Sequence, residues 1–198
     1  GLNIVMRVQW TPAWARPPDT MPSHPPTDPQ DFAEFMRAVA TRYKGQVRAY
    51  EIWNEQNINY EWGMREPNPA EYVALLKAAY AAIKQADPAA LVLTGGLSTT
   101  GGGGEGAMGD VLYIEGMYAA GVQGFCDAIS THPYGFGRDP DYHDEWGLSF
   151  TRAATQHEAM VRAGDAQTPL WVTELGWPVK TNWDLGSQHG PTTVTFQQ

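Results

Sequence analysis

The sequence predicts an α/β fold and, within that class, an incomplete (β/α)₈ TIM barrel. Five short apolar stretches alternate with four amphipathic ones at a spacing of roughly 40 residues, the pattern of a parallel sheet. Polar and aromatic residues follow these apolar stretches where each ends, as at the C-terminal face of a barrel. The first turn is rich in proline and lacks the Gly-x-Gly-x-x-Gly pattern of open nucleotide-binding sheets. A whole barrel needs about 250 residues, so we expect residues 1–198 to form one partial barrel domain, with about three strands outside this sequence.

The first elements follow from apolar runs and helix signals. Residues 3–10 are mostly apolar and have the length of a buried strand. Residues 11–27 contain six prolines, which exclude regular structure. A helix is predicted over residues 29–44, because Asp28 is a good N-cap, proline occupies the first helical position and glycine follows the end. The β-branched and aromatic residues 47–53 predict the second strand.

The remaining elements repeat the same logic. Asn68 followed by proline predicts a second helix that ends at Asp87-Pro88. The glycine-rich residues 100–106 predict a flexible rim loop. The other strands are expected at residues 91–97, 124–132 and 169–174, and the other helices at residues 110–120 and 148–163.

Composition restricts the class of partner. The net charge of −9 argues against nucleic acid or an anionic membrane as the main partner, since both need clustered Lys and Arg. No apolar run is long enough to span a membrane, and no charged-then-apolar leader is present, which leaves localisation open. Cys126 is the sole cysteine, so an internal disulfide is excluded. Oligomeric state is not predicted.

Two glutamates are the candidate catalytic residues. Glu55 follows the second predicted strand and Glu174 the last, and each has a tryptophan nearby in sequence. Either could be an ordinary exposed loop carboxylate. Two carboxyl groups at the same end of a parallel sheet are, however, what cleavage of a glycosidic bond requires, because one protonates the leaving oxygen while the other attacks or activates water.

Three motifs lie at strand ends in the order Trp53-Asn54-Glu55, Thr131-His132-Pro133-Tyr134 and Thr173-Glu174-Leu175-Gly176-Trp177. In this order and spacing they resemble the clan A glycoside hydrolases, and most of all their cellulase-like and family 39-like (xylosidase- and iduronidase-like) members. The resemblance extends over nearly the full length of this chain. It implies that the chain corresponds to strands 3 to 7 of the family's barrel and to the start of helix 7.

The resemblance implies a role for each matching residue. Glu55 is similar to the general acid/base and Glu174 to the nucleophile of a retaining hydrolase. Asn54 is expected to hydrogen-bond the sugar 2-hydroxyl, and His132 and Tyr134 to lie beside Glu174 and keep it ionised. His132 could otherwise be a core histidine with its hydrogen bonds satisfied.

Two further charged residues lie in the predicted strands. The family has an arginine on strand 2 beside the nucleophile, which falls outside this chain, and Arg7 in the first strand is not assigned that role. Glu51 shares a strand face with Glu55 but lies about 7 Å deeper, so we interpret it as a support residue.

Tryptophans are expected to form the sugar-binding surface. Trp10, Trp62 and Trp177 all follow strand ends, where flat aromatic faces suit the C–H faces of sugar rings. Any one of them could instead be a core residue. Trp10 and Trp177 are the first choices for a platform.

No metal or cofactor is predicted. The five histidines lack the paired spacing of a zinc site, and the glycine-rich loop lacks the Gly-Lys-Ser/Thr ending of a phosphate loop. The favoured function is a retaining O-glycosyl hydrolase that acts on an oligo- or polysaccharide. The alternatives are a non-catalytic carbohydrate-binding or degenerate barrel, and a barrel enzyme that holds a metal in the acidic loop over residues 139–145.

Overall fold

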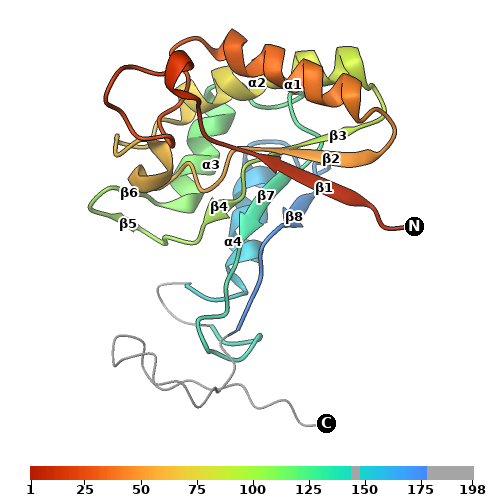
Figure 1. Cartoon of the computed structure of the whole chain (residues 1–198). Helices are drawn as coiled ribbons and strands as arrows, with labels where there is room; N and C mark the ends of the chain where they lie inside the picture. Colours follow the sequence, from red (N-terminus) through yellow and green to blue (C-terminus); the bar gives the residue numbers. More distant parts are fainter. Residues whose placement is uncertain (144–147, 178–198) are drawn as a thin grey trace, which may run out of the picture.

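A computed structural model describes residues 1–143 and 148–177 of the chain. Helices and strands alternate along it, and the helices α1 and α2 lie together along one side of the strands β1, β2 and β3 (Figure 1). The strands are β1 (Ile4–Val8), β2 (Val47–Ile52), β3 (Leu91–Thr94), β4 (Leu97–Ser98), β5 (Gly103–Gly104), β6 (Ala107–Met108), β7 (Ile129–His132) and β8 (Leu170–Val172). The helices are α1 (Pro29–Arg42), α2 (Pro69–Ala86), α3 (Asp110–Ala119) and α4 (Arg152–Arg162), with 3₁₀ turns η1 (Ala13–Ala15) and η2 (Asn59–Trp62).

The main strands are parallel and follow one another in chain order. One sheet has the order β1-β2-β3 and the other β4-β7-β8. A parallel bridge between Leu93 and Ala128 joins them, supported by a bond from Thr94 N to Ala128 O (3.2 Å). This sequential parallel order confirms the α/β prediction, and the strands of the described part do not close a barrel.

Two local differences from the prediction lie at glycine-rich positions. The strand expected over residues 91–97 is divided at Gly95-Gly96 into β3 and β4. The glycine-rich loop is not irregular throughout, because β5 within it pairs with β6 directly after it as a small antiparallel hairpin.

The predicted N-caps are confirmed. The Asp28 side chain accepts from Gln30 N (2.9 Å) and begins α1, while Asn68 accepts from Ala70 N and Glu71 N (3.1 Å each) and begins α2. Both helices carry proline at the first position, where a missing N–H costs nothing.

The core lies between the strands and the helices. It gathers Tyr50, Ile52 and Trp53 around β2 with Met36 of α1 and Leu76 of α2, all fully buried. The first strand departs from its prediction as a buried strand: Ile4 is 48% exposed and Val5 45% exposed. Within the described residues β1 pairs only with β2, so its free edge and one face meet solvent.

Among the described helices, none combines the length and hydropathy needed to cross a lipid bilayer.

Candidate active site

The structure brings the two predicted carboxylates together with His132. Glu55 follows β2, His132 ends β7 and Glu174 follows β8, and these strands all run in the same direction. One potential ligand atom from each side chain lies within 4.8 Å of the other two. The structure therefore places these three side chains close together at the carboxyl ends of parallel strands, as the sequence predicted.

The backbone after β2 breaks the strand alternation. Trp53 (φ 77°) and Glu55 (φ 41°) both adopt left-handed conformations that non-glycine residues rarely take. Trp53 is thereby placed in the core, where its Nε1 donates to Glu61 O (2.7 Å), while the Glu55 amide donates to Gly96 O (2.9 Å). Strained conformations of this kind persist where the surroundings over-determine them and are common at active sites.

His132 lies between the two carboxylates and close to both. Its ring is fully buried, and Nδ1 lies 3.1 Å from Glu55 Oε1 and 3.7 Å from Glu174 Oε2. On the other side, Nε2 lies 3.8 Å from Glu51 Oε1, too far for a direct hydrogen bond. Burial lowers the pKa of His132, but the surrounding carboxylates outweigh burial and raise it to about 9. The imidazolium form is thus stabilised at neutral pH.

Glu51 is the predicted support residue and is buried beneath this histidine. Its Oε1 accepts from Gly96 N (2.9 Å) and from Thr173 Oγ1 (2.8 Å). A single carboxylate thereby ties β2 to the β3–β4 break and to the segment that carries Glu174. These contacts fit the support interpretation.

Glu174 is held as an anion by two donors. The Tyr134 hydroxyl donates to Oε2 (2.6 Å), as the sequence resemblance implied, and Arg7 Nη1 donates to Oε1. Burial raises the pKa of Glu174, yet the hydrogen bonds from Tyr134 and Arg7 and the nearby charge of His132 leave that pKa lowered overall. The same hydrogen bond raises the pKa of Tyr134 to about 12, so this phenol stays a donor.

Arg7 is the site residue that sequence reasoning missed. It lies on β1 opposite Glu51 of β2, and residues paired in this way present their side chains to the same face of the sheet. Its Nη1 contacts both Glu174 Oε1 and Asn54 Oδ1, the latter at 2.7 Å. The available signal was a lone arginine inside an apolar stretch, since such a charge requires an acidic partner.

Two of the predicted tryptophans lie at the surface near strand ends. Trp10 follows β1 with φ 73°, is 50% exposed, and its Nε1 lies 3.4 Å from Glu61 Oε2. Trp177 is partly exposed, and its Nε1 donates to Arg138 O (2.6 Å). Trp177 also packs against the backbone of Gly135, where any side chain would collide with the indole.

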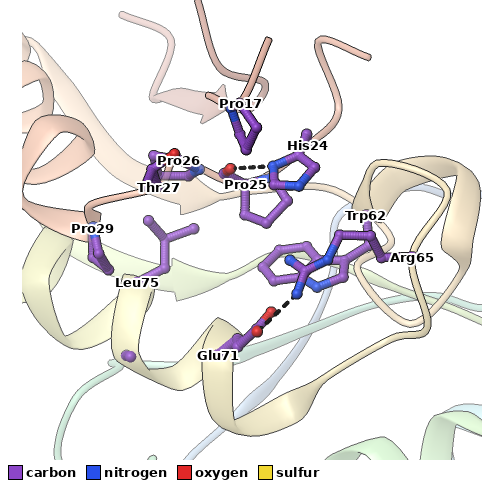
Figure 2. A pocket seen from close by; sticks show the side chains of 11 residues that line it. Pro17, His24, Pro25, Pro26, Thr27, Pro29, Trp62, Arg65, Glu71 and Leu75 are labelled. Carbon is purple, nitrogen blue, oxygen red and sulfur yellow. Dashed lines mark hydrogen bonds and ion pairs between the residues drawn. The ribbon is translucent and has the colours of Figure 1, made fainter. Parts of the chain in front are cut away.

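The third tryptophan is a correction to the predicted sugar-binding set. Trp62 is fully buried, in edge contact with Trp53 and Tyr72, because η2 turns it into the core. It lines a separate cavity of about 400 Å³ between the proline-rich loop and α2 (Figure 2). Arg65 and Glu71 form an ion pair in that cavity (2.8 Å), and neither catalytic candidate lines it. Trp62 therefore does not present its ring to the carboxylate pair.

The spacing of Glu55, His132 and Glu174 would in principle admit a cation. The atoms concerned already have partners, because Glu55 contacts His132 while Glu174 contacts Arg7 and Tyr134. A protonated His132 and the Arg7 guanidinium also place positive charge where a cation would sit. The alternative metal loop was predicted over residues 139–145, of which residues 144 and 145 lie outside the described residues.

Comparison with known proteins gives likeness in structure alone. No protein-family model and no curated protein matches the sequence. Among solved structures, the chain is similar to a family 39 glycoside hydrolase from the gut symbiont Bacteroides cellulosilyticus WH2 (TM-score 0.65, 26% identity), covering 93% of this chain and 38% of that one.

Two further structures show the same likeness. One is a monomeric β-xylosidase from Caulobacter crescentus CB15 (TM-score 0.62, 20% identity, 86% of this chain and 36% of that one). The other is a β-glucanase from Saccharophagus degradans in complex with cellotetraose (TM-score 0.51, 19% identity, 97% and 49%). The chain thus has the fold of part of a clan A glycoside hydrolase and spans well under two thirds of the length of each of these three proteins.

Proposed function

We propose that this chain carries the catalytic carboxylates of a retaining O-glycosyl hydrolase that acts on an oligo- or polysaccharide. One observation supports this more than any other: a carboxylate oxygen of Glu55 and one of Glu174 lie within 4.8 Å of each other. Retaining enzymes hold their two carboxyl groups about 5–5.5 Å apart, whereas inverting enzymes need about 6.5–9.5 Å to admit a water. The short separation favours direct attack by a carboxylate.

The two carboxylates would take different roles because their surroundings differ. Glu174 is kept ionised by Arg7, Tyr134 and His132, as a nucleophile requires. Glu55 has no cationic partner other than His132 among the described residues and follows a strained turn at the strand end. It would protonate the leaving oxygen, and later remove a proton from the water that hydrolyses the glycosyl-enzyme.

The first test is hydrolysis of 4-nitrophenyl β-xyloside and of cellotetraose, because two of the similar proteins are a β-xylosidase and a β-glucanase in complex with cellotetraose. Glu174→Ala should lower kcat by several orders of magnitude on a substrate that the parent cleaves. Glu55→Ala should lower it less on the nitrophenyl substrate, whose leaving group needs little protonation.

The matched control is Glu105→Gln, which neutralises an exposed glutamate of the glycine-rich loop. It should leave turnover unchanged. Full activity in Glu174→Ala would exclude the proposal, and NMR detection of the first-formed anomer separates retention from inversion. Saccharide binding that survives loss of both glutamates, with no hydrolysis by the parent, would favour a non-catalytic carbohydrate-binding protein, and loss of activity with a chelator would favour a metal enzyme.

A further inference from the structure

We propose that the cavity between the proline-rich loop and α2 is a second, non-catalytic binding site that takes a saccharide ring. The inference goes beyond the proposed function, because neither Glu55 nor Glu174 lines this cavity. Its volume of about 400 Å³ lies in the lower part of the range for small-ligand sites, about 300–1,000 Å³. The cavity therefore has room for a small ligand or for one end of a longer one.

The walls of the cavity are largely apolar and are already in place without a ligand. Helix α2 supplies Ala74 and Leu75, and the loop supplies four prolines, Pro17, Pro25, Pro26 and Pro29 (Figure 2). Proline fixes the backbone angle φ, and backbone bonds from Thr11 N to Pro22 O (2.7 Å) and from Thr27 N to Ala15 O (2.8 Å) hold the loop in position. A ligand that enters such a preformed site loses little of its binding free energy to the ordering of the protein.

His24 offers a hydrogen-bond acceptor at this cavity. Its Nδ1 lies 2.6 Å from Pro25 O, and because a carbonyl oxygen only accepts, Nδ1 carries the proton and donates. In the neutral ring Nε2 is then an acceptor, and the described residues provide no partner for it. The side chain is also held from behind, since a Cβ added at Gly63 (φ 72°) would collide with His24. A hydroxyl that reaches Nε2 would thus donate to a nitrogen of fixed position.

The Arg65–Glu71 ion pair (2.8 Å) supplies both donors and acceptors to the same cavity. A single side-chain bond engages the guanidinium, so most of its five N–H groups have no partner among the described residues. Trp62 also lines the cavity, and its buried Nε1 lacks a hydrogen-bond partner in the described part of the chain. A hydroxyl oxygen that reached this N–H would supply the missing acceptor.

The charges around the cavity select a neutral, hydroxylated ligand. A carboxylate or phosphate would meet the carboxylate of Glu71 and the acceptor nitrogen of His24, whereas a cation would meet the guanidinium of Arg65. A saccharide carries no charge, and its hydroxyls both donate and accept. Its C–H faces can pack on proline and leucine side chains. A saccharide ring therefore fits these walls better than an anion or a cation does.

The test is a titration followed by ¹H–¹⁵N NMR, with cellotetraose, xylose and, as an anionic contrast, inorganic phosphate. The indole N–H signal of Trp62, identified by its absence in Trp62→Phe, reports on the cavity. A Glu174→Gln background prevents hydrolysis of the tetrasaccharide during the titration. Cellotetraose or xylose should shift the signal to saturation while phosphate leaves it in place. No saturable shift with either saccharide, or a shift with phosphate alone, would overturn the proposal.

Ala74→Phe separates binding in this cavity from binding at the active site. Ala74 is an exposed residue of α2 that lines the cavity, so a phenyl ring at this position would occupy part of it. The saccharide Kd read from the Trp62 signal should rise about tenfold or more. Ala81→Phe is the matched control, because it adds the same ring at an exposed position of α2 outside the cavity and should leave the Kd unchanged. Equal Kd values for Ala74→Phe and its background would contradict the proposal.

Two further readouts keep the result decisive. If circular dichroism shows that Ala74→Phe does not fold, Glu71→Gln decides instead: it removes one member of an exposed ion pair and should weaken saccharide binding, and unchanged binding would reject the site. In the chain with Glu174 intact, a folded Ala74→Phe should hydrolyse 4-nitrophenyl β-xyloside at the parent's rate, and loss of that hydrolysis would show that the cavity is not separate from the catalytic site. If the parent cleaves no glycoside, the proposed function fails, and the Trp62 titration still decides whether the cavity binds a saccharide.

Discussion

At the scale of single residues, the stability of the carboxylate cluster depends on the protonation of His132. Three carboxylates, Glu51, Glu55 and Glu174, surround the buried ring of His132. Anions so close together repel one another, and a protonated histidine among them offsets that repulsion. The cluster is thus stable as a group, and its stability changes with the proton on His132.

The first prediction is a pH dependence of stability that His132 carries. Its pKa is raised from 6.5 to about 9 in the fold, so its contribution is fully present below pH 6.5 and is lost as pH rises through about 9. The difference in unfolding free energy between the parent and His132→Gln should therefore be greatest near pH 6 and shrink toward pH 10. Urea unfolding at several pH values measures it. A difference that is flat or grows with pH would contradict a protonated His132.

The second prediction concerns the close approach of Gly96 to His132. A methyl group at Gly96 would collide with the His132 ring, which is fully buried and has little room to move. Gly96→Ala should destabilise the fold by about 1–3 kcal/mol and lower any glycosidase activity by misplacing the ring. Gly102→Ala is the control, since nothing lies within 4 Å of its added methyl group. Thermal melts that coincide for the two variants would count against this contact.

The sequence predicted the convergence of the strand-end residues better than it predicted the places of Arg7 and Trp62. Glu55, His132 and Glu174 were expected to converge because each lies at a strand end, and parallel strands bring such ends together. Arg7 was missed because it lies inside a strand, where sequence alone does not reveal which face a residue occupies. Trp62 was misplaced because a 3₁₀ turn, invisible in the pattern, directs it into the core.

At the scale of elements, the helices on the outside are fastened to one another by specific polar contacts. Asp110 at the start of α3 is fully buried and accepts from Arg152 (2.7–3.2 Å) and from Gln156 of α4 (2.5 Å). Glu115 of α3 and Arg162 of α4 form a second ion pair, with both side chains about half exposed. Two ion pairs between the same helices thus differ mainly in burial.

The third prediction follows from that difference. Asp110→Asn leaves the Arg152 charge in a largely buried position without its partner, which should cost about 3 kcal/mol or more of unfolding free energy. Glu115→Gln removes an exposed ion pair and should cost about 1 kcal/mol or less. Urea unfolding of both variants and of the double variant Asp110→Asn with Arg152→Met is the measurement. The double variant should recover part of the unfolding free energy that Asp110→Asn loses. Equal costs for the two single variants would show that burial does not set the contribution of these ion pairs to stability.

The starts of α1 and α2 were the part of the fold best predicted from sequence, whereas α4, expected over residues 148–163, begins only at Arg152. Asp28 and Asn68 begin their helices as expected because an N-cap needs only residues next to it in the chain. The division of the third strand at Gly95-Gly96 was not predicted, because it depends on Glu51, whose side chain takes the hydrogen bond of Gly96 N. Residues adjacent in the chain therefore predict where a helix starts, whereas a strand break that depends on a side chain distant in the sequence is not predicted.

At the scale of the molecule, the two outermost parallel strands each have an unpaired edge in the part of the chain that the structure describes. β1 pairs only with β2 and β8 only with β7 in the part of the chain that the structure describes. Leu2, Ile4 and Val5 are 96%, 48% and 45% exposed, and Val172 of β8 is 43% exposed. In a closed barrel every strand has two neighbours, so the unpaired edges are where this structure differs from the fold that it partly shares.

The last prediction is that β1 drives self-association of the isolated chain. An exposed, apolar strand edge offers unpaired N–H and C=O groups together with a hydrophobic face, and such edges pair with other chains. Val5→Lys should therefore reduce concentration-dependent association measured by sedimentation velocity. Val161→Lys, which removes a comparably exposed valine from α4, controls for surface hydrophobicity alone. An equal reduction by both variants would assign association to apolar surface in general, and a parent that stays monomeric at every concentration would show that the β1 edge is protected despite its exposure.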